Sequence, residues 1–218
     1  MNYEAIQKKI RQYQDEGKQL FTSSSFQTHS TVLLHIISRI DKSIPVYFIN
    51  TGFLFPDTIR YKDQLASLLD LNIVEVKSSI PKSQQKDMSG HLLFSSDPDY
   101  CCSLNKIQPL EPVLAKYDVW INGVRADQTA VRQQMKVEEQ SKYGTIRFHP
   151  MLDWSSKEIY AYIREYKIPK HPLDDKGYMS IGCEPCTRKI IAGDERSARW
   201  FGLNKTECGL NTDLVIKK

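Results

Sequence analysis

Four of the five cysteines in the sequence occur in two close pairs. Cys183 and Cys186 are separated by two residues in the segment SIGCEPCTR, and Cys101 and Cys102 are adjacent in DPDYCCSLNK. A pair of the first kind is typical of a metal site or a redox dithiol, but two thiols alone leave a tetrahedral metal site incomplete. The second pair would complete such a site if the C-terminal part of the chain folds back onto it.

The segment around Cys101 and Cys102 is predicted to start a helix, with Asp97 as the N-cap and Pro98 at the first position. Neighbouring side chains on a helix point about 100° apart, so an adjacent pair rarely serves one tetrahedral ion. Each iron of a cubane cluster takes its own ligand, which suits an adjacent pair better. The four paired cysteines therefore favour a [4Fe–4S] cluster over zinc. Two buried structural thiols beside an unrelated pair are the remaining interpretation.

The fifth cysteine, Cys208, stands alone in the polar segment KTECGL. With the other four assigned to a metal, it is a candidate nucleophile. Lys205, Arg196 and Arg199 would lower its pKa if they fold close to it, whereas the neighbouring Glu207 would oppose that effect. A surface cysteine without a chemical role is the alternative.

Small hydroxyl residues lie between the first predicted strand and the first predicted helix of the core, where TSSSFQTHS contains Ser23, Ser24 and Ser25. In such a turn, backbone N–H groups and the helix N-terminus can surround an anion. The segment lacks the Gly-x-x-x-x-Gly-Lys pattern of a nucleotide P-loop. It predicts a phosphate or sulfate site, although an ordinary turn with a good N-cap has the same composition.

Arginines in two segments are candidates for contacts with the same anion. Arg125 follows a predicted strand in GVRADQTAVR, and Arg196 and Arg199 lie in GDERSARW. The guanidinium group suits bidentate binding of phosphate or sulfate. Without further support, however, such arginines are more often solvated surface residues.

Strand-like and helix-like segments alternate along the chain, which predicts a mostly parallel sheet with helices on both faces. We expect a single α/β domain over residues 1–218, with a core over about 1–166 and an irregular tail over 167–218. Strands are predicted within 18–22, 45–51, 72–76, 118–124 and 146–149, helices within 32–40, 56–69 and from Ser155 onward, and a loop with room for a short helix within 77–97.

Ligands of open α/β sheets bind beyond the carboxyl ends of the strands. That rule places three predicted turns around one crevice: the Ser23–Ser25 turn, the Thr51–Phe55 turn and the Gly123–Arg125 turn. The serines and Arg125 would therefore meet at one site.

The amino-acid composition is typical of a globular protein, since 40% of the 218 residues are hydrophobic and 26% are charged. A formal net charge of only +4 gives no reason to expect a nucleic-acid partner. The N-terminal segment has no apolar core of the signal-peptide type, and no stretch approaches the roughly 18 apolar residues of a membrane span. We therefore expect a cytoplasmic protein without a membrane partner, whose thiols stay reduced.

Together these motifs resemble the sulfonucleotide reductases, specifically the assimilatory adenylyl-sulfate (APS) reductases that carry an iron–sulfur cluster. The resemblance runs from about Phe21 to Leu210 and follows the family order of motifs. Those motifs are SSSFQTHS, INTGFLFPDT, DPDYCC, GVRADQ, SIGCEPCTR, DERSARW and ECGL. The family implies an adenine-nucleotide α-hydrolase-like fold.

The resemblance also implies residue roles. Cys208 matches the nucleophile, and Lys106 matches a lysine between cluster and substrate. Asn211 stands where the tail motif usually has a histidine, which departs from the family pattern. The remaining matches are cluster ligands at Cys101, Cys102, Cys183 and Cys186, an anion-binding loop at Ser23, Ser24 and Ser25, and arginines near the phosphosulfate at Arg125, Arg196 and Arg199.

The implied reaction is reduction of adenylyl sulfate to sulfite and AMP through a cysteine thiosulfonate, with thioredoxin or glutaredoxin as the electron donor. It would serve sulfate assimilation and cysteine biosynthesis. The related reductases acting on the 3′-phosphorylated nucleotide (PAPS) typically retain only the tail cysteine, so the paired thiols favour APS over a PAPS or dual-substrate enzyme. More distant alternatives are an ATP-pyrophosphatase-type tRNA-modifying protein and a Cys₄ zinc-binding interaction module.

Overall fold

The computed structural model describes residues 1–189, 198–200, 202, 205, 207–214. Its centre is a six-stranded sheet, in which the neighbouring strands are parallel except at one edge. The strands are β1 (Leu20–Ser24), β2 (Val46–Ile49), β3 (Ile73–Val76), β4 (Val119–Ile121), β5 (Glu138–Gln140) and β6 (Ile146–Phe148). Their order is β3-β2-β1-β4-β6-β5, and β5 runs antiparallel to β6.

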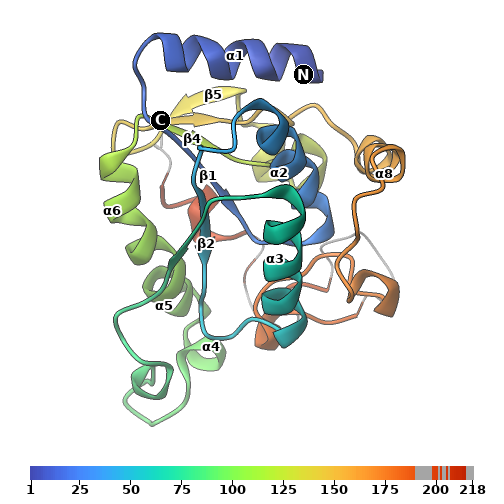
Figure 1. Cartoon of the computed structure of the whole chain (residues 1–218). Helices are drawn as coiled ribbons and strands as arrows, with labels where there is room; N and C mark the ends of the chain where they lie inside the picture. Colours follow the sequence, from blue (N-terminus) through green and yellow to red (C-terminus); the bar gives the residue numbers. More distant parts are fainter. Residues whose placement is uncertain (190–197, 201, 203–204, 206, 215–218) are drawn as a thin grey trace.

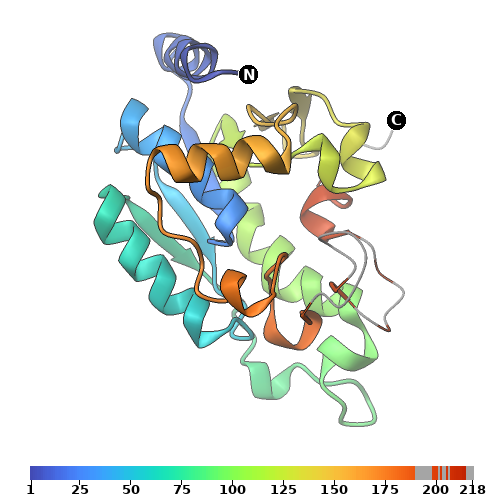
Figure 2. The same cartoon turned by 90° about the vertical axis from the view of Figure 1, so that its right-hand side faces the viewer.

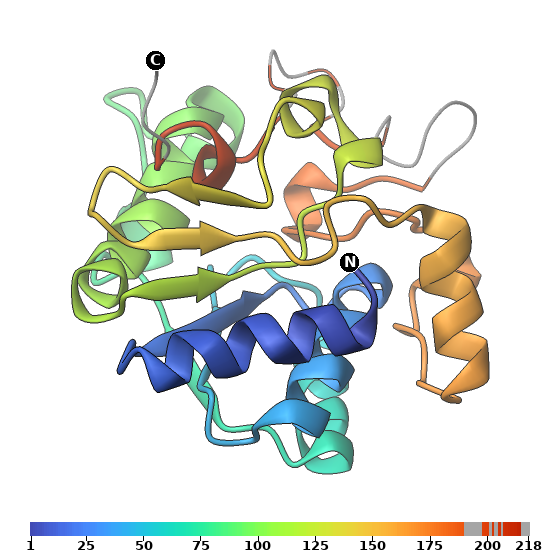
Figure 3. The ribbon, with the colours of Figure 1, turned by 90° about the horizontal axis from the view of Figure 1, so that it is seen from above.

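The described helices are α1 (Tyr3–Asp15), α2 (Thr28–Ile40), α3 (Pro56–Leu69), α4 (Leu93–Ser96), α5 (Pro98–Cys102), α6 (Gln108–Lys116), α7 (Ala130–Gln133) and α8 (Ser156–Glu165). Helices α2, α3 and α8 lie on one side of the sheet, and α5 and α6 lie on the other (Figure 1). Helix α1 runs alongside the sheet (Figure 3), and its Tyr13 makes an edge-to-face contact with Phe148 of β6. The sheet is therefore covered on both faces.

Both faces of the inner strands are apolar, as expected for a parallel sheet between helices. Phe21 of β1 and Trp120 of β4 stack with their ring centroids 6.1 Å apart and belong to the cluster that includes Leu114 of α6. Val46 and Ile121 belong to the larger cluster on the other side, with residues of α1, α2 and α8. These strands hold the turns at their carboxyl ends in fixed positions.

The predicted α/β fold with a mostly parallel sheet is confirmed. Helix α8 begins where its capping box predicts, because the Ser155 hydroxyl accepts from the Glu158 N–H and the Glu158 carboxylate accepts from the Ser155 N–H. The loop at 77–97 contains the short helix α4, as expected. The antiparallel strand β5 was not predicted, since its sequence EEQ has no apolar alternation.

Helices α5 and α6 are joined by a π-helical segment, η2 (Ser103–Ile107), which carries Lys106. Pro109 follows one turn later, and in a regular α-helix its ring would clash with the carbonyl of residue 105. A π-helical turn widens the backbone at this point, and such turns occur frequently at functional sites. The irregularity falls directly after the adjacent cysteines.

The segment that follows α8, coloured orange in Figure 2, returns past the sheet towards α5. Two backbone contacts fasten it there: Leu54 and Cys183 form an isolated bridge, and the Glu184 N–H donates to the Phe53 carbonyl at 2.7 Å. The second cysteine pair is thereby brought to the turn after β2. Among the described helices, none combines the length and apolar character needed to cross a membrane.

Candidate active site

The turn after β1 is held in an unusual backbone conformation. Phe26 has φ of 54°, in the left-handed region that costs a residue with a side chain about 1–2 kcal/mol. Its fully buried ring packs edge-to-face on Phe48 at 5.5 Å, which anchors the turn in the core. Strain of this kind persists where the surroundings fix it and is common at ligand-binding turns.

Two of the three serines in this turn have defined partners. The Ser23 hydroxyl accepts from the Trp120 indole N–H at 2.8 Å. Ser24 accepts from the Phe26 N–H at 3.1 Å and contacts the Ser30 hydroxyl at 3.2 Å. Helix α2 starts directly afterwards, and the described residues supply no side-chain cap to its N-terminus. A helix N-terminus of this kind, with its positive dipole end, can receive an anion.

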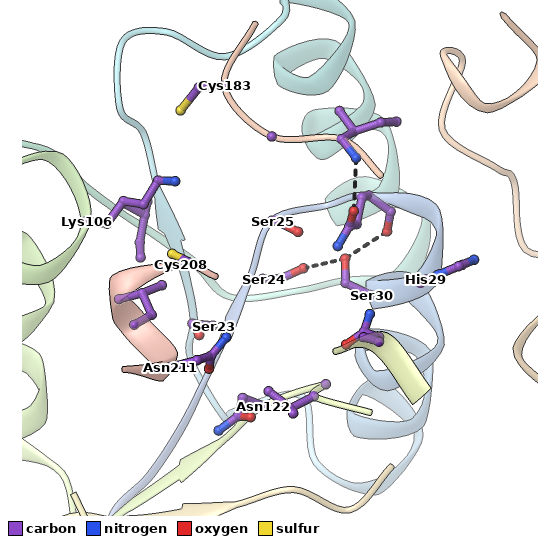
Figure 4. Close-up of a pocket in the computed structure, with 18 of the residues that line it drawn as sticks. Ser23, Ser24, Ser25, His29, Ser30, Lys106, Asn122, Cys183, Cys208 and Asn211 are labelled. Carbon is purple, nitrogen blue, oxygen red and sulfur yellow. Dashed lines mark hydrogen bonds between the residues drawn. The ribbon is translucent and has the colours of Figure 1, made fainter. Parts of the chain in front are cut away.

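Cys208 lies in the wall of a pocket of about 210 Å³ that is also lined by Ser23, Ser24 and Ser25. Figure 4 shows Cys208 and Lys106 on one side of this pocket, across from Ser24 and Ser25. The tail is thus folded so that its half-buried thiol and the serine turn line the same pocket. The spacing in sequence between these groups gave no direct indication of this arrangement.

An ion pair anchors the residue before Cys208. Arg132 donates from Nε to Glu207 Oε2 and from Nη2 to Glu207 Oε1, both at 2.9 Å, and both side chains are buried. Glu207 Oε1 also accepts the backbone N–H of Cys208 at 2.8 Å. The negative charge of Glu207 beside Cys208 is therefore balanced by a bidentate guanidinium.

The two cysteine pairs meet at a second, smaller cavity. Cys101, Cys102, Cys183 and Cys186 all line it. Burial, followed by the charges of the other three cysteines, raises the pKa of Cys101 to about 12. Burial also raises the pKa of Cys102 and of Cys186.

The four thiols around this cavity are the described residues that could hold a metal ion or an iron–sulfur cluster. Within the described ranges, no three His, Cys, Asp or Glu side chains converge on one metal-ion position. A tetrahedral zinc ion needs its four ligands at one point, whereas an iron–sulfur cluster needs them arranged around it.

The two cavities share part of their walls. Lys106, Cys183 and Thr51 line both of them. The Thr51 hydroxyl contacts the Cys183 sulfur at 3.2 Å. Burial alone would lower the pKa of Lys106, but the sulfurs of Cys208, Cys183 and Cys102 raise it above its usual value. Lys106 is therefore a half-buried ammonium that lines both the cavity of the paired thiols and the pocket of Cys208.

The three predicted arginines have different positions. Arg199 lines the pocket, and its Nε donates to the Cys186 carbonyl at 3.3 Å. Arg125 is not among the described residues that line the pocket; its Nη2 donates to Ser156 at 2.8 Å and its Nε to Asp127 at 3.0 Å. It joins the turn after β4 to the start of α8. Arg196 lies outside the described residues.

Sequence reasoning missed Arg132 and Asn122, which the fold brings into the pocket wall. Arg132 belongs to the same motif, GVRADQTAVR, as Arg125. Its position seven residues further on, after a turn and a short helix, gave no signal for either a pocket or an ion pair. Asn211 also lines the pocket, and its amide contacts Glu207 at 3.3 Å.

Residues 19–189 match the phosphoadenosine phosphosulfate reductase domain family, and the chain belongs to this family. An adenosine 5'-phosphosulfate reductase of Chelativorans sp. (strain BNC1) is 42% identical over 206 residues, which cover 93% of this chain and 82% of that protein. A phosphoadenosine 5'-phosphosulfate reductase of Gloeobacter violaceus is 38% identical over 200 residues, which cover 89% of this chain and 83% of that protein.

Among solved structures, the chain is similar to a phosphoadenylyl-sulfate (PAPS) reductase from Candida auris in a phosphate complex. The TM-score is 0.69 at 25% sequence identity, and the match covers 82% of this chain and 87% of that one. The architecture expected from the motifs is thus that of a solved member of the family.

Proposed function

We propose that this chain is an APS reductase, which reduces adenylyl sulfate to sulfite and AMP for sulfate assimilation and cysteine biosynthesis. The observation that carries the proposal is that Cys208 and the serine turn line the same pocket. An anion held by that turn lies in front of a thiol. The curated relative from Chelativorans, named for APS, supports the same substrate.

The first step joins the Cys208 sulfur to the sulfur of the bound sulfonucleotide. The Cys208 thiolate supplies the electron pair of the new S–S bond, and the bond between sulfur and the phosphate oxygen breaks. AMP leaves with the electron pair of the broken S–O bond, and Cys208 retains the SO₃⁻ group as a thiosulfonate. This step is nucleophilic catalysis, in which one difficult transfer is divided into two.

Repulsion between a thiolate and an anionic sulfate opposes this step, so the pocket must supply positive charge. Lys106 and Arg199 line it, and the N-terminus of α2 points its N–H groups at the serine turn. Such groups, fixed before the reaction begins, stabilise the negative charge that grows on the departing phosphate.

The second step requires an external dithiol, for which we propose thioredoxin, with glutaredoxin as the alternative. One donor thiolate attacks the Cys208 sulfur, and the S–SO₃ bond breaks with its electrons leaving on sulfite. The donor's second thiol then attacks its own sulfur in the mixed disulfide and returns Cys208 as a thiolate. The two electrons that form sulfite come from the donor.

We also propose that Cys101, Cys102, Cys183 and Cys186 hold a [4Fe–4S] cluster. When bound, it would fix the cysteine loop and contribute an electrostatic field, without supplying electrons to this reaction. Its link to the substrate would be Lys106, which lines both cavities. The proposal is supported by the four thiols that line one cavity, because a cluster needs its ligands arranged around it.

The substrate is tested by assaying APS and PAPS separately with reduced thioredoxin and anaerobically purified protein. We expect sulfite from APS at a kcat/KM well above that for PAPS. The relative from Gloeobacter and the structure from Candida auris are both named for PAPS, which makes it the competing substrate. A strong preference for PAPS would overturn the substrate assignment, and no sulfite from either nucleotide would overturn the reductase proposal.

A further inference from the structure

Arg147 on β6 is fully buried and reaches the catalytic tail. Its Nη2 donates to Asn211 Oδ1 at 3.0 Å, and its Nη1 donates to Glu139 Oε1 at 3.2 Å. Its Nε has no hydrogen-bond partner among the described residues. Burial lowers the pKa of Arg147 to about 10, so the group stays charged at neutral pH. A buried charge with an unsatisfied N–H is costly and calls for an explanation.

The amide of Asn211 connects Arg147 to Cys208 through the Glu207 carboxylate. Its Nδ2 donates to Glu207 Oε1 at 3.3 Å, and the same carboxylate oxygen accepts the Cys208 N–H. Three hydrogen bonds therefore connect the guanidinium of Arg147 on the sheet to the backbone of Cys208. Figure 4 shows Asn211 and Cys208 on the same side of the pocket.

The same guanidinium also contacts the anion-binding side of the pocket. It lies 5.0 Å from the ring centroid of Trp120, within the range of a cation–π contact. The Trp120 indole N–H donates to the Ser23 hydroxyl. Arg147 thus contacts Asn211, which is hydrogen-bonded to the Glu207 carboxylate beside Cys208. It also contacts Trp120, which is hydrogen-bonded to Ser23 of the turn.

We propose that Arg147 and Asn211 are positioning residues, which together fix the Cys208 thiol relative to the anion held at Ser23–Ser25. The inference rests on the proposed nucleophilic role of Cys208. It assigns a task to Asn211, which stands where the family motif usually has a histidine. A displacement of about 1 Å between reacting groups can reduce a rate about 100-fold, so such fixing has a measurable effect.

An amide suits this position because it can accept from a guanidinium and donate to a carboxylate at the same time. An aspartate would keep the contact with Arg147 but would repel Glu207. A leucine would remove both hydrogen bonds while keeping the branched shape of the side chain. The two substitutions therefore break different parts of the connection.

The test measures the two half-reactions separately in Asn211→Asp, Asn211→Leu, Arg147→Met and the Arg147→Met/Asn211→Leu double variant. Single-turnover formation of the SO₃ adduct is followed by intact mass without a thiol donor and at saturating APS. We expect adduct formation to slow by about 10- to 100-fold in each single variant, while the Kd for AMP changes by less than about threefold. We expect the double variant to be no slower than the slower single variant, because both substitutions break one connection.

Wild-type adduct rates in both Asn211 variants would overturn the inference, as would fully additive losses in the double variant. A merely structural role would instead weaken AMP binding and the rate together. The Asn211 variants decide the question even if Arg147→Met fails to fold. Arg60→Met, in an exposed arginine of α3, is the control and should react at the wild-type rate. Cys208→Ser separates the two proposals, since an adduct in that variant refutes the nucleophile itself.

Discussion

The Glu207 carboxylate is held by the Arg132 guanidinium through two hydrogen bonds of 2.9 Å, directly beside Cys208. The pair joins the tail to the segment after β4, across 75 residues of sequence. It fixes the backbone from which the thiol projects and neutralises the nearest negative charge. The reactivity of the tail therefore depends on residues of the core.

We predict that Arg132→Met lowers the free energy of unfolding by about 3–5 kcal/mol, because Glu207 remains buried without its partner. Chemical denaturation measures this change. The Arg132→Met/Glu207→Leu double variant should recover most of the stability, since both charges are gone. It should not recover sulfite formation, because the Cys208 N–H has lost its acceptor. A double variant as unstable as the single one would refute the ion-pair account.

Gly209 follows the nucleophile at a close approach of the tail to η2. A Cβ at this position would lie 2.7 Å from Ile107 Cδ1 and 2.8 Å from Asp213 Oδ2. We predict that Gly209→Ala slows adduct formation about tenfold by pushing Cys208 away from the pocket. Ile107→Val removes the contacting methyl group, so the Gly209→Ala/Ile107→Val double variant should recover part of the rate. No difference between the two variants would show that this contact does not set the tail position.

Metal content should separate the paired cysteines from the single one. Anaerobically purified protein is predicted to contain iron and acid-labile sulfide, both lost in Cys101→Ser and Cys183→Ser. Cys208→Ser should retain them, because its thiol lies in the wall of the other pocket. Zinc at full occupancy in the wild-type protein would contradict the cluster assignment.

Lys106→Ala is predicted to keep most of the iron and to reduce kcat/KM at least about 100-fold, since it removes a positive charge from the pocket wall. Steady-state assays and iron analysis on the same preparation give both values. Lys116→Ala, an exposed lysine of α6, should leave both unchanged. Normal kinetics for Lys106→Ala would remove its linking role.

The sequence was sufficient for the parts of the fold that local patterns encode. Apolar runs predicted the parallel strands, and the capping box at Ser155 predicted the start of α8. β5 escaped prediction because a short edge strand needs no apolar face. The sheet order and the packing of α6 depend on contacts between residues that are far apart in the sequence, and no local pattern predicts such contacts.

For the site, residue types predicted the thiols and the serine turn, but not the contacts that position them. Arg125 was the arginine favoured by its place after a strand, yet the structure brings Arg132 to the pocket wall instead. Arg147 and Asn211 are 64 residues apart and meet only because the tail folds back over the sheet. Single-sequence patterns carry no signal for such a pair.

The central claim is that Cys208 attacks the sulfur of the nucleotide and carries the SO₃ group. The direct measurement is incubation of the reduced protein with APS in the absence of a thiol donor, followed by peptide mass spectrometry of all five cysteines. We predict one added SO₃ group, located on the peptide that contains Cys208 and released as sulfite when reduced thioredoxin is added. An adduct on any other cysteine, or sulfite formation without an adduct, would contradict the mechanism.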